Sequence, residues 1–354
     1  MLFDSIITST TRVSRADYLS NYGGLIDDLA QMNDSPFNRQ ALADARSVVD
    51  DLGARELAGG LKRLLRFDFG DRSLAPELQM GKVAAIDGTF ILPMQKNTFG
   101  NMIVVGVASN SYARRPEESM HAYSTRIVFE TSPPTNSAEF VNRLSEELEG
   151  IFPTAYMRYF EAVHALEIDE PYVLCDGALV TEWLANTSVG RDIYLKLLGQ
   201  KRAIGVMKGL KDNKKLGIIG RVLRPGELVI YETLEQHLNG RAQAKANSDR
   251  LTQWKGDGAF SSLVKKIWRG AFKPSNKAYG FECHEDHLDP MLRILAADAF
   301  VQQPGHSIPY LLHAVDQFIR NNFAKDGLQA AISARLAASG DDLFFDETDE
   351  IDFR

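Results

Sequence analysis

The stretch VAAIDGTF at residues 83–90 has a counterpart in YVLCDGAL at residues 172–179. In each stretch a short apolar run, typical of a buried strand, leads to an Asp-Gly pair. The other two Asp-Gly pairs, at residues 257 and 326, stand in polar surroundings and are typical of turns. A carboxylate at the end of a buried strand is costly unless it is paired or bound to a cation, so Asp87 and Asp176 are candidate functional residues.

Two such strands lying side by side would bring Asp87 and Asp176 together. Carboxylates that close repel each other unless a divalent cation lies between them, and oxygen ligands suit Mg²⁺ or Mn²⁺. The alternative is that the two pairs are independent hairpin turns.

The segments around these stretches predict a mixed α/β fold. Short runs rich in branched residues predict three or four antiparallel strands between residues 83 and 131. Helical periodicity predicts a helix from 137 to about 167, with Ser137 as N-cap and a restart at Pro153, and a further helix over 181–198. This order favours a sheet with antiparallel and parallel parts over a doubly wound sheet.

Length and composition set wider bounds. The 354 residues allow two domains or one large domain, and 44% hydrophobic with 25% charged residues excludes collagen-like, coiled-coil and wholly disordered proteins. No apolar run of membrane-spanning length and no signal peptide is found, so we expect a cytoplasmic protein without membrane association. Cys175 and Cys283 are too few for a disulfide framework and are expected to be reduced thiols.

The net charge of -7 is unevenly distributed. Residues 341–354, DDLFFDETDEIDFR, carry seven acids and one base, and they alternate acids with large apolar residues. This composition is typical of a disordered segment that docks on a partner or folds back over a basic surface of its own chain.

Residues 196–280 carry the opposite charge, with 18 Lys or Arg against 6 Asp or Glu. They form a candidate phosphate-binding surface, or else they solvate exposed helix faces. Aromatic residues in the same stretch could stack on unpaired bases or could belong to the core. The candidate nucleic-acid-binding residues are Lys208, Lys211, Lys214, Lys215, Arg221, Lys265, Lys266, Arg269 and Lys273.

A third ligand is expected from the helix between the two Asp-Gly strands. Glu161 lies within the helical pattern, 15 residues before Asp176, at about the distance needed for the helix to return and face the strand end. The acids at 167–170 lie at the connection and are expected to face water, although one of them could be the ligand instead. A solvated helix carboxylate is the alternative for Glu161.

A last candidate segment is GHSIPYLLHAVDQFIR, residues 305–320. It predicts a helix that starts after Pro309, in which His313 and Asp316 share one face and could point at a metal or a water. A buried structural histidine is the alternative.

In this order, VAAIDGTF, the Arg-x-x-Glu of MRYFEAV, YVLCDGAL, RAIGVMKG and IPYLLHAVD resemble the motifs of the NurA nuclease family, over roughly residues 80–322. The resemblance implies a ribonuclease-H-like core that degrades DNA with Mn²⁺ or Mg²⁺. It places Asp87 in the first strand, Glu161 in a helix, Asp176 in the fourth strand and Lys208 on the strand that follows. Family members often have Tyr-Pro in the last motif, whereas this chain has Ile308-Pro309.

The resemblance also implies partners: DNA, a HerA-type hexameric ATPase that translocates DNA, and a second copy in a homodimer. The expected protein has a helical N-terminal region (1–75), a NurA-like nuclease domain (76–340) with a basic insertion around 196–280, and an acidic-aromatic tail (341–354). Two metal ions held by Asp87, Glu161, Asp176 and Asp316 would act with Lys208 and His313.

The resulting hypothesis is a metal-dependent deoxyribonuclease in DNA end processing or phage defence. A catalytically silent nucleic-acid-binding or adaptor subunit on the same fold is the alternative from another class. A ribonuclease or a transposase-like nuclease is the alternative enzyme. The sequence leaves open the polarity of digestion, the preference for single- or double-stranded DNA, and the choice of Mn²⁺ or Mg²⁺. It also leaves open whether the protein acts in DNA repair or in phage defence.

Overall fold

The computed structural model describes residues 36–54, 61–91, 102–113, 121–126, 152–210, 214–244, 250–299, 308–323 and 334. Several sequence predictions lie outside these residues: the strand beyond residue 126, the Ser137 N-cap, Lys211, the Asp-Gly pair at 326 and the acidic-aromatic tail.

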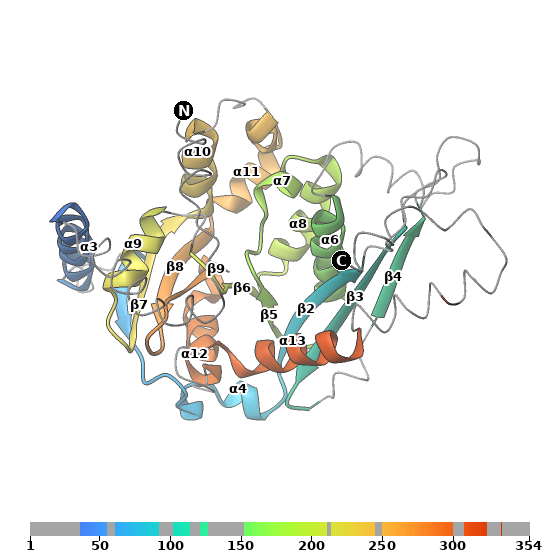
Figure 1. The fold of residues 1–354 in the computed structure, drawn as a ribbon, viewed down its shortest axis with the longest axis horizontal. Coiled ribbons are helices and arrows are strands. Elements are labelled where there is room, and N and C mark those ends of the chain that lie inside the picture. Colours follow the sequence, from blue (N-terminus) through green and yellow to red (C-terminus); the bar gives the residue numbers. More distant parts are fainter. Residues whose placement is uncertain are drawn as a thin grey trace, which may run out of the picture.

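The described residues form one mixed sheet of nine strands in the order β1-β7-β8-β9-β6-β5-β2-β3-β4 (Figure 1). The strands are β1 (Arg63–Arg66), β2 (Val83–Ile91), β3 (Met102–Ser111), β4 (His121–Arg126), β5 (Tyr172–Asp176), β6 (Ala203–Met207), β7 (Glu227–Thr233), β8 (Ile267–Lys273) and β9 (Tyr279–His284).

One half of the sheet has the arrangement that the sequence predicts. Strands β2, β3 and β4 are antiparallel neighbours, and β5 and β6 continue the sheet parallel to β2. Counted from β2, Asp87 lies in the first strand and Asp176 in the fourth. The predicted fold class, a mixed α/β sheet flanked by helices, is confirmed.

The other half is built by the basic segment 196–280 and its continuation. Strands β7, β8 and β9 pair antiparallel, and β9 joins β6, so the segment is part of the sheet. The sequence did not predict this pairing, because charge composition says nothing about strand partners. Isolated strands cannot satisfy their backbone groups, and these do so by extending the sheet.

The N-terminal region is only partly helical in the described residues. Helix α3 (Pro36–Ala54) confirms the helical pattern, but Arg63–Arg66 form β1, paired with β7 at the sheet edge. Periodicity alone cannot distinguish a short strand from a helix turn in so brief an apolar run, and pairing with β7 decides for the strand.

Helices cover both faces of the sheet (Figure 1). The remaining α-helices are α4 (Pro76–Gln79), α6 (Phe152–Glu167), α7 (Glu182–Ala185), α8 (Ser188–Gly199), α9 (Lys214–Val222), α10 (Leu234–Ala244), α11 (Gly258–Val264), α12 (Leu288–Asp298) and α13 (Tyr310–Asn322). Three short 3-10 helices are η2 (Arg72–Leu74), η4 (Arg250–Gly256) and η5 (Glu285–His287).

Strand β2 shows how the alternation of side chains builds two cores. Ala84 and Ile86 pack with α6, α7 and α8 in one cluster, whereas Val83 and Ala85 pack with α12 and α13 in the other. Because successive residues of a strand point to opposite faces, Asp87 lies on the face covered by α13.

The aromatic residues of the basic segment belong to the core. Trp254, Phe272, Tyr279 and Phe281 are buried and Trp268 is partly buried against the core, so of the two alternatives the structure supports core packing over base stacking. Both cysteines are free thiols, as predicted. Among the described residues, no helix combines the length and apolar character needed to cross a bilayer.

Candidate metal centre

Asp87 and Asp176 lie side by side on neighbouring parallel strands. The recorded pairing of β2 with β5 ends at Ile86 opposite Cys175, one residue before each aspartate. Asp176 is the last residue of β5, but β2 continues to Ile91 paired with β3, so Asp87 lies within its strand and not at its end. The two Asp-Gly pairs therefore meet, as the functional interpretation expects, and are not independent hairpin turns.

Asp316 of α13 completes the cluster. One oxygen each from Asp87, Asp176 and Asp316 lie within 4.8 Å of one another. The buried stripe of α13 includes Leu312, Val315 and Ile319, and Asp316 lies on this stripe, facing the sheet. The third member of this close cluster is thus Asp316 and not Glu161.

Positive charges border the cluster. Lys208, one residue after β6, forms ion pairs from its Nζ to Asp176 Oδ2 at 2.9 Å and to Asp316 Oδ1 at 3.2 Å. Arg320, one turn after Asp316, donates from its Nη2 to the same Oδ1 at 3.1 Å and is largely exposed. The predicted position of Lys208 beside the acids is therefore observed.

Helix α6 approaches the site across the two glycines of the Asp-Gly pairs. A Cβ at Gly88 would lie 2.8 Å from Glu161 Oε1, and a Cβ at Gly177 would lie 2.6 Å from Arg158 Nη2. Gly177 also has a φ of +84°, which favours glycine. The glycines thus make room for the Arg-x-x-Glu pair of α6.

Arg158 joins α6 to the strand end. It donates from Nη1 to Glu161 Oε2 at 2.7 Å and to the backbone carbonyl of Asp176. Glu161 therefore lies next to the aspartate cluster, held by an arginine, with its other carboxylate oxygen directed at Gly88.

Two buried carboxylate oxygens at this site have no hydrogen-bond partner among the described residues: Asp176 Oδ1 and Glu161 Oε1. Burial, followed by repulsion from Asp176 and Glu161, raises the pKa of Asp87 well above its ordinary value. Burial also raises the pKa of Glu161, and the charge of Arg158 offsets this only in part. The chain's own cations leave the buried acids under-compensated.

At the margin of the site, neighbouring charges outweigh burial in setting the pKa values of Asp316 and Lys208. Burial opposes ionisation of Asp316, but a hydrogen bond from Asp87 and the charges of Lys208 and Arg320 outweigh it and lower the pKa of Asp316. Burial of Lys208 disfavours its charge, yet the surrounding aspartates raise its pKa, so this lysine remains an ammonium.

The aspartate cluster lines a cavity of about 330 Å³. Its lining residues are Asp87, Gly88, Thr89, Met157, Arg158, Asp176, Asp316, Ile319 and Arg320. Each acidic side chain of the site offers carboxylate oxygens as metal ligands. Two buried carboxylate oxygens, Asp176 Oδ1 and Glu161 Oε1, have no hydrogen-bond partner in the described structure. Both features fit a hard divalent cation such as Mg²⁺ or Mn²⁺.

His313 is half-buried on α13 and is absent from both the cavity lining and the aspartate cluster. The structure thus favours Asp316 over His313, because only Asp316 lies on the stripe that faces β2. The predicted role of His313 in catalysis receives no support from its position.

The predicted nucleic-acid-binding residues have different environments. Lys215, Arg221, Lys265 and Lys266 are exposed and Lys273 is half-buried; Lys211 and the side chain of Lys214 lie outside the described residues. The prediction for Arg269 was wrong. Its side chain is 4% exposed, with its Nε donating to Glu282 Oε1 at 2.7 Å and its Nη1 to Glu232 Oε1 at 3.0 Å. This guanidinium pairs with two glutamates inside the sheet, so it is not available to a phosphate at the surface.

The sequence analysis did not name Arg158 or Arg320 as site residues. Arg158 carries a signal, the Arg-x-x-Glu spacing that places it on the same helix face as Glu161. Arg320 lies four residues after Asp316, which is also a helical spacing, but exposed i,i+4 pairs are too common to indicate a site.

The similarity of this chain to known proteins lies in its fold. No family model and no curated protein matches the chain. The NurA nuclease from Sulfolobus solfataricus is structurally similar with a TM-score of 0.48 and 10% identity, over 89% of this chain and 98% of that chain. A NurA structure with manganese has a TM-score of 0.30 and 10% identity, over 60% and 80% of the two chains.

Endonuclease V from Streptomyces avermitilis is similar with a TM-score of 0.32 and 13% identity, over 80% of this chain and 93% of that chain. The family that the sequence motifs resemble is thus represented among the similar structures. At these identities and TM-scores, the functional proposal rests on the geometry of the site.

Proposed function

We propose that this protein is a divalent-metal-dependent nuclease that hydrolyses phosphodiester bonds in DNA. The observation that carries the proposal is the aspartate cluster of Asp87, Asp176 and Asp316, whose oxygens lie within 4.8 Å of one another in a cavity. Burying three carboxylates together costs stability unless cations offset their repulsion. A catalytic centre for a highly charged substrate explains why that cost is retained.

Asp87, Asp176 and Asp316 would hold Mg²⁺ or Mn²⁺, with Glu161 as a further ligand through its unpartnered Oε1. Bound ions of this kind activate a water and stabilise the leaving oxygen of a phosphodiester. Two ions are proposed, from the number of carboxylates and from the NurA resemblance.

The basic residues of the site would act on charge and orientation. Lys208, kept as an ammonium by its aspartate neighbours, would stabilise the negative charge that develops on the phosphate. Arg158 would orient Glu161 and fix the end of β5 through the carbonyl of Asp176. Arg320 lines the cavity at its exposed margin and would contact a substrate phosphate.

The DNA substrate, a homodimeric state, a cytoplasmic location and partnership with a HerA-type ATPase in end processing or phage defence are proposed from the motif resemblance. The exposed Lys215, Lys265 and Lys266 would contribute sequence-independent phosphate contacts. The proposed organisation is a NurA-like nuclease domain over residues 76–340, preceded by an N-terminal region and followed by the acidic-aromatic tail.

The decisive experiment is digestion of end-labelled single-stranded DNA, double-stranded DNA and RNA in EDTA, Mg²⁺ or Mn²⁺. Metal-dependent cleavage of DNA is expected, with loss of cleavage in Asp176→Asn. Asp286→Asn is the matched control, because Asp286 is a half-exposed carboxylate paired with Lys201 away from the cluster.

Cleavage that persists in EDTA, or in Asp176→Asn at wild-type rate, would overturn the proposal. Tight DNA binding without cleavage under any metal would instead favour the silent binding or adaptor subunit. Preferential cleavage of RNA would favour the ribonuclease alternative.

A further inference from the structure

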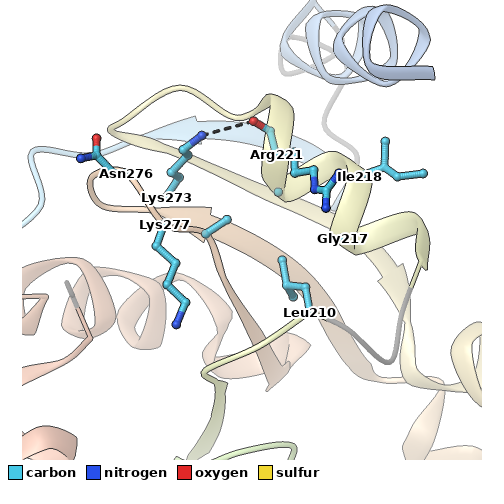
Figure 2. A pocket seen from close by; sticks show the side chains of 9 residues that line it. Leu210, Gly217, Ile218, Arg221, Lys273, Asn276 and Lys277 are labelled. Atoms are coloured by element: carbon cyan, nitrogen blue, oxygen red, sulfur yellow. Dashed lines mark hydrogen bonds between the residues drawn. The ribbon is translucent and has the colours of Figure 1, made fainter. Parts of the chain in front are cut away.

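A second, larger cavity lies between α9 and the β8–β9 hairpin, with a volume of about 690 Å³ (Figure 2). Its residues are Leu210, Gly217, Ile218, Gly220, Arg221, Lys273, Asn276, Lys277 and Ala278. We call it the α9 groove. It shares no lining residue with the cavity of the metal centre.

The α9 groove is positively charged on the described surface. Arg221, Lys273 and Lys277 line it, no acidic residue does, and none of the three has a carboxylate ion pair among the described residues. Lys273 Nζ instead donates to the backbone carbonyl of Arg221 at 3.2 Å, which places its charge at the groove (Figure 2).

The groove is also partly apolar. Leu210, Ile218 and Ala278 contribute carbon surface, and Ile218 is 37% exposed, one of few large apolar side chains that the described residues leave open to solvent. The phosphates of a nucleic-acid backbone would contact only the cations of the groove. A peptide with acids and large apolar side chains would contact both the cations and the apolar carbon surface.

We propose that the acidic-aromatic tail of the same chain, residues 341–354, docks in the α9 groove. Its sequence places Leu343, Phe344 and Phe345 between Asp341-Asp342 and Asp346-Glu347, which matches an apolar surface bordered by cations. With seven acids and one base, the tail is complementary in charge to Arg221, Lys273 and Lys277.

The chain is long enough for this contact. Helix α13 and its C-cap end at Phe323, so residues 324–340 precede the tail. Fully extended, 17 residues reach up to about 60 Å; residue 334 is helical, and one helical turn there shortens this reach by roughly 8 Å, to about 50 Å, against a radius of gyration of roughly 20 Å expected for a chain of this length. A tethered segment also has an effective local concentration in the millimolar range, so weak individual contacts suffice.

Docking would affect nucleic-acid binding because the α9 groove begins close along the chain to Lys208, the lysine of the metal centre. Leu210 of the groove is two residues after Lys208, and a Cβ at Gly220 would lie 2.6 Å from Leu210 Cδ1. The tail would thus compete with an extended substrate. This consequence rests on the proposed nuclease function, whereas the docking itself does not.

Disulfide trapping in the full chain tests the docking without any measurement of activity. The variant Ile218→Cys with Phe345→Cys pairs the groove with the tail. Met80→Cys with Phe345→Cys is the matched control, since Met80 is an exposed apolar residue after α4, outside the groove. Cys283 is buried and Cys175 is half-buried in β5, so the native thiols should compete little with the introduced pair.

In a glutathione redox buffer, the intramolecular disulfide of the groove pair should form at least about tenfold more than that of the control pair. Adding Lys273→Glu and Lys277→Glu should abolish this preference, and adding Asp341→Lys and Asp342→Lys as well should restore it.

Equal yields at Ile218 and Met80, or a preference that charge reversal leaves unchanged, would overturn the proposal. A disulfide-linked dimer in place of the intramolecular product would assign the groove to the tail of a second copy and would also overturn it. So would equal losses of single-stranded DNA affinity on Lys273→Glu and Lys277→Glu with and without the tail, since the groove would then belong to nucleic acid alone.

Discussion

Two groups of carboxylates on and against this sheet differ in how their charge is balanced. On β7, β8 and β9, Arg269 lies in register between Glu232 and Glu282 and pairs with both. On β2, β5 and α13, three aspartates converge, and the nearest cations, Lys208 and Arg320, lie at their margin.

The hydrogen bonds of the two groups differ in the same way. Glu282 Oε1 accepts from Arg269, and Glu282 Oε2 accepts from the backbone N–H of Leu179 at 2.9 Å. At the metal centre, by contrast, Asp176 Oδ1 and Glu161 Oε1 are unpartnered in the described structure. Burial of acids alone therefore does not indicate a functional site; a cluster of acids whose charges are incompletely compensated does.

The strongest test of this comparison is Asp87→Asn. Because the pKa of Asp87 is raised in the metal-free protein, the neutral amide resembles its resting form, and stability without metal should stay level or rise. Cleavage should fall at least about 100-fold, and stabilisation of the protein by Mg²⁺ or Mn²⁺ in thermal unfolding should be lost. Near wild-type cleavage by this variant would contradict the metal-centre assignment.

Arg269→Met breaks the compensated group. It leaves Glu232 and Glu282 buried without their cation, and the free energy of unfolding in urea should fall by about 3–5 kcal/mol. The control is Lys265→Met on the same segment, because Lys265 is 58% exposed and its pairing with Glu235 at 3.7 Å should contribute at most about 1 kcal/mol.

Adding Glu232→Gln and Glu282→Gln to Arg269→Met should recover part of the lost stability, since no buried charge then lacks a partner. If Arg269→Met lowers the free energy of unfolding no more than Lys265→Met does, pairing with Arg269 does not stabilise the buried glutamates as the comparison requires.

Asp298 is an intermediate case, a buried carboxyl with hydrogen bonds but no cation paired to it among the described residues. Tyr112 Oη donates to it at 3.0 Å and the backbone N–H of Leu311 at 2.9 Å, yet burial raises its pKa from 3.8 to about 7. The unfolded chain would release this proton near pH 4, whereas the folded chain keeps it until about pH 7.

Stability should therefore fall as the pH rises from about 4 to 7, by roughly 4 kcal/mol at most, and then level off. Urea unfolding at several pH values should show this slope in the wild type and a flatter one in Asp298→Asn. An unchanged slope in the variant would show that Asp298 ionises normally in the folded protein.

The smallest effect is expected for Arg320→Ala at the exposed margin of the metal centre. Its guanidinium is largely exposed, so its pairing with Asp316 is screened by water and should contribute at most about 1 kcal/mol to unfolding in urea. The variant Arg320→Lys keeps the positive charge and should retain most of that contribution. A loss comparable to that of Arg269→Met would mean that this ion pair is far less screened than its exposure indicates.

Much of the half of the fold that contains β2 to β6 was predictable from the chain. Apolar runs ending in Asp-Gly located β2 and β5, helical periodicity located α6 and α13, and both patterns arise from the spacing of side chains along a single element. The edge strand β1 and the pairing of β7, β8 and β9 were not predictable, because strand partners are chosen by contacts between distant segments.

For the site, the sequence identified Asp87 and Asp176 as a pair and left Asp316 and His313 as alternatives. It could not show that Asp316 joins the aspartates while Glu161 is held beside them by Arg158. Nor could it show that Arg269 is used inside the sheet whereas its neighbours Lys265 and Lys266 are exposed.

The chain by itself thus specifies which residues are chemically capable and on which face of its own helix or strand each one lies, since these depend only on residue type and local period. Which capable residues become neighbours was decided by tertiary structure. Parallel pairing of β2 with β5 joined Asp87 to Asp176, and packing of α13 on β2 added Asp316. Charge compensation depends on distances between segments far apart in sequence, and folding alone sets those distances.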